Sequence, residues 1–307
     1  MKRVLIFGIS GFVGKYLAEE FLSHNYEVIG SDIDKNSNLP HNITFHSANI
    51  LNELEIAEII RITCPDVIVN LAAVSSVGAS WEIPQTTINV NVIGALNILE
   101  STRKYYPKCK VLFIGSSEEY VISKYPMSED RELDATNPYG ISKVTQEQFA
   151  KMYRDYYKMN VYCVRAFNHT GIGQKESFVL PSWCKQVAEI AKSGKPGRIK
   201  VGNLSVQRDF SHVKDIVRAY RLIVESDDCS VIYNIGSGKA YKLEEMLEYI
   251  ISLCNQEINV EIDKDRFRPS DQPVICCDHS LITSQLGWEP NFTVFDALKE
   301  LYESYIV

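Results

Sequence analysis

A tyrosine and a lysine four residues apart form the first pair in this sequence that could do chemistry. Tyr139 and Lys143 follow Asn137 and Pro138, and a capping residue before a first-turn proline predicts that a helix begins here. Residues four apart project from one face of a helix, so the ammonium would lie beside the phenol and lower its pKa from an ordinary value of about 10. Tyr139 would then exchange a proton near neutral pH. A surface pair has the same spacing, so the assignment needs further residues.

Hydroxyl and carboxylate side chains follow an apolar run a little earlier in the chain. Residues 110–114 predict a buried strand, and Ser116, Ser117, Glu118 and Glu119 come soon after it. Ligands of open α/β folds bind at the carboxyl edge of the sheet, where such a segment would lie. A serine there can hydrogen-bond a substrate carbonyl, and a carboxylate can orient or protonate the substrate. The alternatives are a hydroxyl-rich turn for the serines and a solvated loop for the glutamates.

Three glycines separate the first predicted strand from the first predicted helix. Gly8, Gly11 and Gly14 have the spacing GxxGxxG, which allows a tight turn and a close approach of the backbone to a pyrophosphate at a helix N-terminus. Asp32 closes the next predicted strand, where a carboxylate can bind the adenosine ribose and would repel a 2′-phosphate. The pattern predicts a dinucleotide site that favours NAD(H), with NADP(H) as the alternative. A plain tight turn and a solvated strand end are the other interpretations.

Short apolar runs alternate with amphipathic segments through the first half of the chain. Nearly continuous apolar strands between helices predict an α/β fold with a doubly wound parallel Rossmann sheet. After residue 166 the pattern loosens, which indicates a smaller, mixed α/β substrate domain at the C-terminal side. We expect the Rossmann domain over 1–166 plus about 213–238, and the second domain over about 167–212 plus 239–307. The predicted strands are 4–7, 27–32, 43–45, 66–71, 110–114 and 161–165, and the predicted helices are 16–22, 52–62, 85–105 and 138–158.

Composition limits the class of protein. The chain has 307 residues, 45% of them hydrophobic and 23% charged, which is ordinary for a packed globular protein. Its net charge of −7 disfavours nucleic acid and anionic membrane surfaces as partners, and no apolar run approaches the roughly 20 residues of a membrane span. Eight scattered cysteines predict neither a disulfide framework nor a zinc site, and no other metal site is expected. We expect a cytoplasmic protein.

In combination, the glycine turn, Asp32, the Ser116 segment and the Tyr139–Lys143 pair resemble the extended short-chain dehydrogenase/reductase family. The resemblance implies that Tyr139 exchanges a proton with the substrate oxygen, that Ser116 polarises this oxygen, and that Lys143 also holds the nicotinamide ribose. A binding protein without turnover is the alternative, but it would not need all three side chains. The implied cofactor site comprises Gly8, Gly11, Phe12, Val13, Gly14, Asp32, Asn49, Ile50, Leu71, Ala72, Ala73, Tyr139 and Lys143.

Later segments are similar to the sugar-nucleotide branch of that family, and within it to reductases of GDP-linked 4-keto-6-deoxy sugars. These segments are 165–171, 201–204, 208–210 and 268–271. The resemblance implies an oxidoreductase acting at C4 of a GDP-sugar, which reduces GDP-4-keto-6-deoxy-mannose to GDP-D-rhamnose or an analogous GDP-hexose or GDP-heptose. Two arginines fit this, because guanidinium groups bind diphosphates through charge-assisted contacts. The implied substrate site comprises Ser75, Ser117, Asn168, Val179, Lys185, Arg208, Arg268 and Asp271, with Glu118 as a fourth catalytic residue.

Two further activities fit the same motifs. Glu118 occupies the position of the proton-shuttling carboxylate of the related 4,6-dehydratases, and an enzyme of this build could also act as a C4 dehydrogenase or epimerase in the oxidising direction. Residues 170–174 run Thr-Gly-Ile-Gly-Gln, as in the reductases, which argues against the dehydratase. Val121 and Ile172 stand where the reductases usually have Gly and Pro, so the exact sugar stays open.

The resemblance also implies a homodimer. In this family the helices expected near 85–105 and 138–158 commonly pair across a dimer as a four-helix bundle. Ile88, Val92, Leu96 and Leu99 recur at three- and four-residue spacing on the first of them. Packing of this stripe on the sheet of the same chain is the alternative.

Overall fold

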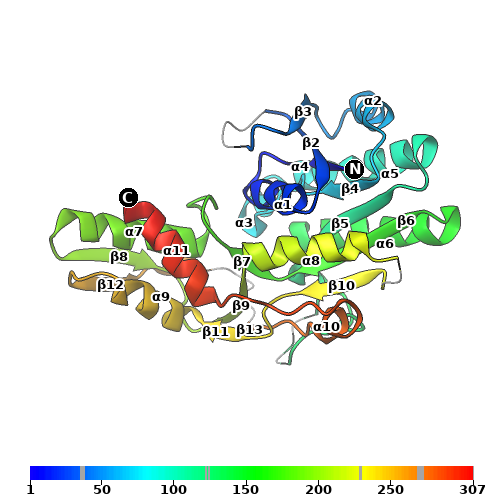
Figure 1. Cartoon of the computed structure of the whole chain (residues 1–307). Helices are drawn as coiled ribbons and strands as arrows, with labels where there is room; N and C mark the ends of the chain where they lie inside the picture. Colours follow the sequence, from blue (N-terminus) through cyan, green and yellow to red (C-terminus); the bar gives the residue numbers. More distant parts are fainter. Residues whose placement is uncertain (35–38, 122, 124, 228–229, 268–272, 307) are drawn as a thin grey trace.

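A parallel sheet of seven strands forms the larger part of the molecule (Figure 1). The computed structural model describes residues 1–34, 39–121, 123, 125–227, 230–267 and 273–306. The strand order is β10-β6-β5-β4-β1-β2-β3 and every neighbouring pair is parallel, so the predicted doubly wound sheet is confirmed. The strands are β1 (Lys2–Phe7), β2 (Tyr26–Asp32), β3 (Thr44–Ser47), β4 (Val67–Asn70), β5 (Lys110–Ser116), β6 (Asn160–Ala166) and β10 (Ile232–Ile235).

Strand β1 shows why both faces of this sheet are covered. Its last four residues are all buried, with Val4 and Ile6 in the core on one face and Leu5 and Phe7 in the core on the other. Helices therefore pack on both sides. The first face carries α1 (Phe12–Ser23) and α8 (Val213–Glu225), and the second carries α2 (Glu53–Thr63), α5 (Gly94–Tyr105) and α6 (Pro138–Tyr157).

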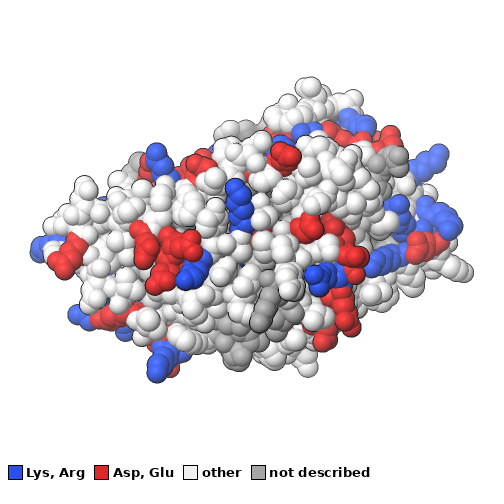
Figure 2. Space-filling view, turned by 90° about the horizontal axis from the view of Figure 1, so that it is seen from below, with Lys and Arg blue, Asp and Glu red and all other residues white. Residues whose placement is uncertain are grey.

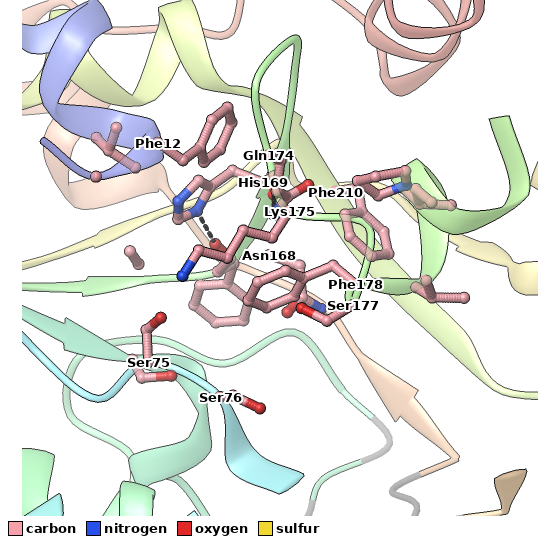
Figure 3. Close-up of a pocket in the computed structure, with 18 of the residues that line it drawn as sticks. Phe12, Ser75, Ser76, Asn168, His169, Gln174, Lys175, Ser177, Phe178 and Phe210 are labelled. Atoms are coloured by element: carbon pink, nitrogen blue, oxygen red, sulfur yellow. Dashed lines mark hydrogen bonds between the residues drawn. The ribbon is translucent and has the colours of Figure 1, made fainter. Parts of the chain in front are cut away.

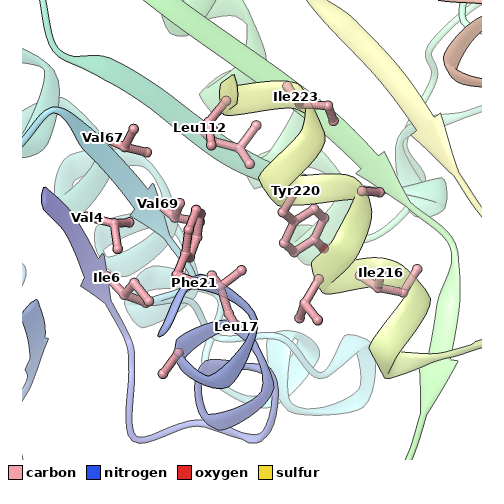
Figure 4. Close-up of a cluster of buried hydrophobic side chains, with 14 of the residues drawn as sticks. Val4, Ile6, Leu17, Phe21, Val67, Val69, Leu112, Ile216, Tyr220 and Ile223 are labelled. Carbon is pink, nitrogen blue, oxygen red and sulfur yellow. The ribbon is translucent and has the colours of Figure 1, made fainter. Parts of the chain in front are cut away.

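The core on the first face brings distant parts of the chain together. Figure 4 shows Leu17 and Phe21 of α1 and Tyr220 of α8 meeting over side chains of the sheet. All three are fully buried. This packing fixes α1, and with it the glycine turn, against the carboxyl edge of the sheet.

A smaller unit follows the sixth strand. Within it, β9 pairs in parallel with β7 and β13 and antiparallel with β11, and helices accompany these strands, so the smaller, mixed α/β unit expected from the sequence is confirmed. Its strands are β7 (Asn168–Thr170), β8 (Gly197–Val201), β9 (Gln207–His212), β11 (Ala240–Lys242), β12 (Ile258–Ile262) and β13 (Val274–Ile275). Its helices are α7 (Val179–Ser193), α9 (Leu243–Ser252) and α11 (Val294–Ile306), with a short turn η3 (Lys264–Arg266).

One late segment returns to the large sheet. Helix α10 (Ser280–Leu286) places Ile282 in the core beneath β10, and the fully buried Trp288 follows it there. The Trp288 indole donates a hydrogen bond to the Asp215 carbonyl oxygen of α8 at 3.1 Å. The division of the chain into two domains stays a prediction.

The single helix expected over 85–105 is divided in the structure. After the short α3 (Val77–Glu82), the chain forms α4 (Pro84–Ile88), one π-helical turn η1 (Asn89–Ile93) and then α5. Inside this turn, the buried Asn91 side chain accepts a hydrogen bond from the Val74 amide at 2.8 Å and donates one to Ser142 Oγ at 2.8 Å. A π turn often marks a functional position, and here it aims an amide at the loop after β4.

Charges of both signs are interspersed on the molecular surface. Figure 2 shows one face on which Lys and Arg alternate with Asp and Glu across both units. No helix in the described part of the chain is long and apolar enough to cross a membrane.

Burial predicts a large difference between two leucines that both lie on helices. Leu17 of α1 is fully buried, whereas Leu54 of α2 is 79% exposed. We expect Leu17→Ala to lower the free energy of unfolding by about 2–5 kcal/mol, because it leaves a cavity in the core. Leu54→Ala should change it by less than about 0.5 kcal/mol. Urea unfolding measures both, and similar losses for the two variants would contradict the packing described here.

Candidate active site

The turn between β1 and α1 requires glycine at two positions. Gly8 has a φ of +79°, and a Cβ there would lie 2.5 Å from the Ala72 amide nitrogen just beyond β4. A Cβ on Gly14 would lie 2.1 Å from the Ile9 carbonyl oxygen. The turn therefore packs directly against the chain after β4, and α1 packs directly against the turn.

The first turn of α1 presents backbone amide donors at the carboxyl edge of the sheet. Its N-cap is Gly11, which has no side chain to cap it, and the first turn contains no acidic residue. Amide groups at such an end bind anions, phosphates above all. Because Gly11–Gly14 line the large cavity described below, these residues fit the pyrophosphate of a dinucleotide.

Asp32 lies at the end of β2, beside this turn. One carboxylate oxygen accepts a hydrogen bond from the Ser10 amide at 3.0 Å and the other accepts one from the Ile33 amide at 2.8 Å. The carboxylate is thus fixed next to the glycine turn, where it can meet a ribose hydroxyl.

The three side chains of the predicted catalytic group lie together. Ser116 ends β5, and Tyr139 and Lys143 lie on the first turns of α6. Tyr139 forms a side-chain hydrogen bond with Ser116, and the Lys143 ammonium lies 5.8 Å from the centroid of the Tyr139 ring. The same ammonium donates a hydrogen bond to the Ile114 carbonyl oxygen of β5 at 2.7 Å. All three side chains line the cavity.

Burial dominates the protonation of this group. It raises the pKa of the Tyr139 phenol above its usual range, although the hydrogen bond from Ser116 works in the other direction. The expected lowering of the Tyr139 pKa is therefore wrong for this structure, because desolvation raises it. Burial also lowers the pKa of Lys143 to about 8. The site thus holds a protonated phenol.

The start of α6 also fixes a carboxylate. As predicted, Asn137 caps the helix, since its side-chain oxygen accepts a hydrogen bond from the Gly140 amide at 2.9 Å. Its side-chain nitrogen donates to a Glu118 carboxylate oxygen at 2.9 Å. Glu118 lines the cavity next to Ser116 and could exchange a proton with a ligand there.

A cavity of about 1210 Å³ connects the glycine turn with the smaller unit. Figure 3 shows Phe12 on one side, Ser75 and Ser76 on another, and side chains from β7, the following loop and β9 around the same space. This volume and the mixed polar and aromatic lining are typical of a ligand site. Of the predicted residues, those that line it are Gly8, Gly11, Phe12, Val13, Gly14, Leu71, Ala73, Ser75, Ser116, Glu118, Tyr139, Lys143, Asn168, Val179 and Arg208.

Four predicted cofactor residues lie outside this lining. Asp32 stands behind the turn, as described, and Ala72 packs under Gly8. The Ile50 side chain packs toward Gly94 on α5, where a Cβ would lie 3.0 Å from it. Asn49 turns its side-chain oxygen to the Leu51 amide at 3.0 Å. The structure therefore gives these residues supporting contacts around the turn and helix rather than places on the cavity wall.

The predicted substrate residues also divide into those that line the cavity and those that do not. Ser117 is buried below the surface of the cavity. Lys185 is part-exposed and does not line the cavity. Its ammonium pairs with the Glu176 carboxylate at 2.6 Å. Arg268 and Asp271 lie outside the described residues.

Several lining residues were not predicted from the sequence. His169 is one of them, and its ring stacks on that of the predicted Phe12 with centroids 6.2 Å apart, which joins α1 to β7 across the cavity. Phe178, Trp183 and Phe210 add an aromatic wall from the smaller unit. Phe210 lies on β9, farther along the chain than His169, Phe178 and Trp183, so no spacing rule could have grouped all four.

Comparisons with known proteins agree with this geometry. The family model described as GDP-mannose 4,6 dehydratase matches residues 5–301. The chain is 27% identical to the GDP-6-deoxy-D-mannose reductase of Pseudomonas aeruginosa, over 99% of this chain and 97% of the relative. It is 30% identical to GDP-mannose 4,6 dehydratase 2 of Arabidopsis thaliana, over 94% of this chain and 83% of the relative. The solved structure of RMD from Pseudomonas aeruginosa, complexed with NADPH, matches with a TM-score of 0.87 at 26% identity, covering 100% of this chain and 98% of that one.

The family match spans the glycine turn, the Ser116 segment, the Tyr139–Lys143 pair and most of α11. The resemblance to sugar-nucleotide enzymes of the extended short-chain dehydrogenase/reductase type is thereby confirmed. The chain belongs to the GDP-mannose 4,6 dehydratase family.

Proposed function

We propose that this protein is a nicotinamide-dependent reductase acting at C4 of a GDP-linked 4-keto-6-deoxy sugar, with GDP-4-keto-6-deoxy-mannose as substrate and GDP-D-rhamnose as product. The observation that carries the proposal is the Tyr139 phenol, hydrogen-bonded to Ser116 on the wall of a cavity that begins at an anion-binding helix terminus. The relative named as a GDP-6-deoxy-D-mannose reductase, matched over nearly the whole chain, supports it.

The proposed chemistry uses each side chain in a state that the structure favours. Ser116 and Tyr139 donate hydrogen bonds to the sugar carbonyl oxygen, and the Tyr139 proton moves to that oxygen as its negative charge develops. Lys143 contributes positive charge close to the phenol ring and stabilises the phenolate that remains. When bound, the nicotinamide dinucleotide supplies the hydride.

A nicotinamide dinucleotide is supported by the turn and by the relative solved with NADPH. The backbone amides of Gly11–Gly14 would hold the pyrophosphate. We propose NAD(H) as the preferred form, because the Asp32 carboxylate beside the turn would repel a 2′-phosphate. NADP(H), named with the Pseudomonas aeruginosa structure, is the alternative.

For the sugar nucleotide, we propose that Arg208, Asn168 and Ser75 bind the substrate. All three line the cavity, and a guanidinium suits a diphosphate. The aromatic wall of Phe178, Trp183 and Phe210 offers apolar surface for the nucleotide base.

A 4,6-dehydratase is the second candidate. Glu118 favours it, because its carboxylate lines the cavity beside Ser116 and is held there by Asn137. A carboxylate at this place could move a proton on the sugar carbon skeleton. The Arabidopsis thaliana relative is named as such a dehydratase. A C4 dehydrogenase or epimerase would use the same Ser116, Tyr139 and Lys143.

We further propose a homodimer formed through α5 and α6. Val92 and Leu99 of the apolar stripe are buried within the protomer, so the stripe itself does not require a partner. The support comes from large apolar side chains left exposed on α6 and at the end of η1, directly before α5, namely Met152, Tyr156, Tyr157 and Ile93. We also propose a cytoplasmic location, because the scattered cysteines predict no disulfide framework.

A panel of ligands tests the substrate and the cofactor together. Ligand binding to the native state raises the midpoint of thermal unfolding by mass action. We expect the largest combined rise with GDP-sugars and NAD(H), against UDP-, CDP- and dTDP-sugars and NADP(H). A larger response to UDP- or dTDP-sugars would contradict the proposed substrate class. Incubation with GDP-mannose separates the second candidate, because loss of water without net cofactor turnover would show a dehydratase.

Tyr139→Phe tests the proposed proton donor. The variant removes one hydroxyl, so cofactor binding should survive while turnover of the 4-keto sugar falls by about 10²- to 10⁴-fold, the usual contribution of a general acid. Tyr125→Phe is the matched control, because that tyrosine is 70% exposed and does not line the cavity. Steady-state rates and cofactor titrations measure both effects. Unchanged turnover in Tyr139→Phe would refute the role of the phenol.

A further inference from the structure

Two adjacent glutamates follow Ser116 and face opposite ways. Glu118 lines the cavity, whereas Glu119 is completely buried behind it. One Glu119 carboxylate oxygen, Oε1, accepts a hydrogen bond from the Ser116 backbone amide at 2.6 Å. Glu119 therefore contacts the catalytic serine from the side that no ligand reaches.

The end of β5 is shaped around this carboxyl group. A Cβ on Gly115 would lie 2.3 Å from Glu119 Oε1 and 2.8 Å from the Val164 carbonyl oxygen of β6. Only a residue without a side chain leaves room here for the carboxyl. Gly115 and Glu119 thus form one packing unit directly beneath Ser116.

The second carboxylate oxygen has unusual surroundings. Glu119 Oε2 is buried and has no hydrogen-bond partner among the described residues, and the same holds for Gln146 Oε1 on α6. Two buried acceptors without donors are rare, and a proton on Oε2 would supply a donor. Burial, together with the neighbouring Glu147 carboxylate, raises the pKa of Glu119 to about 8.

The charges that face Glu119 come from two elements. Tyr139, Lys143 and Glu147 lie on α6, and Arg165 and Cys163 lie on β6. Arg165 is held by Glu147 through two hydrogen bonds of 2.9 and 2.8 Å. Arg165 and Lys143 both favour the ionised form of Glu119, and an ionised Glu119 in turn raises the pKa of Lys143.

We propose that Glu119 is a positioning residue of the catalytic centre, which fixes Ser116 through its amide and controls the proton on Lys143 from behind. The inference rests on the proposed function, because it concerns the same three side chains. It adds a residue that touches neither the cavity nor a ligand within it. It also explains why a carboxyl group is buried where an amide or an apolar side chain would be less costly.

Glu119→Gln tests the control of Lys143. Glutamine keeps an oxygen for the Ser116 amide but cannot become negative as the pH rises through about 8, as Glu119 does. Lys143 should therefore lose its proton more easily in the variant. Activity that needs the protonated lysine is lost as the pH rises through its pKa, which lies at about 8 in the parent protein. We expect kcat/KM of the variant to fall at a pH about one unit lower than in the parent protein, on the alkaline side of the profile. Superimposable profiles would overturn the proposal.

Glu129→Gln is the matched control for this profile. Glu129 also accepts a backbone hydrogen bond, from the Asn234 amide at 2.7 Å, but it does not line the cavity. Its variant should keep the alkaline limb of the parent protein. An equal shift in both variants would mean that any lost buried carboxyl moves the profile, and it would contradict a specific role for Glu119.

Unfolding experiments test the protonation of Glu119 without an activity measurement. A carboxyl whose pKa is about 8 when folded and near 4.5 when unfolded takes up a proton on folding. The parent protein should therefore lose stability relative to Glu119→Gln as the pH rises from about 5 to about 8, with a constant difference above that. We expect the midpoint of thermal unfolding of the variant, minus that of the parent, to increase across this range.

The outcomes of these experiments distinguish the inference on Glu119 from the proposed function. A difference in unfolding midpoint that does not change with pH would overturn the inference on Glu119. Failure of Glu119→Gln to fold while Glu129→Gln folds would overturn it too, because glutamine has the shape of the neutral acid. If the parent protein turned over no GDP-sugar, the proposed function would fail, and the unfolding comparison would still decide on Glu119.

Discussion

The hydrogen bond from the Lys143 ammonium to the Ile114 carbonyl oxygen holds the site together. It fastens α6, which carries Tyr139 and Lys143, to β5, which carries Ser116. Lys143 is only 3% exposed and Ile114 is part-buried, so little water reaches this bond. In such surroundings a charged donor makes a strong bond and an unpaired one would be costly. The geometry of the three side chains is therefore set by the fold before any ligand arrives.

The cavity joins these three side chains to a wall built by the smaller unit. The larger sheet provides the reacting side chains and the amides of the glycine turn, and the smaller unit provides the residues around the far end of the ligand. The two are linked at the seam by the Phe12–His169 stack and by the Tyr16 hydroxyl, which donates to the Ile172 carbonyl oxygen at 2.9 Å. The loop after β7 thus contacts both the turn that would hold the dinucleotide and the wall that would hold the sugar.

Local patterns were enough for the sheet and for much of the site. Apolar runs predicted the parallel strands, and the Asn137–Pro138 start placed Tyr139 and Lys143 on one helix face. Properties that depend on burial in three dimensions could not be predicted from these patterns. Spacing suggested that Lys143 lowers the Tyr139 pKa, but desolvation, which no spacing encodes, raises it. Glu118 and Glu119 look alike in the sequence, yet one lines the cavity and the other is buried. Lys185 could not be seen to pair with Glu176.

The central claim is that Tyr139 and Ser116 present a sugar carbonyl at C4 to the cofactor. Transfer of deuterium from cofactor labelled at nicotinamide C4 tests it most directly, with the product examined by NMR. The account predicts one deuterium at C4 of the GDP-linked 6-deoxy sugar and one equivalent of oxidised cofactor. Product without deuterium at C4, or deuterium at another carbon, would contradict it.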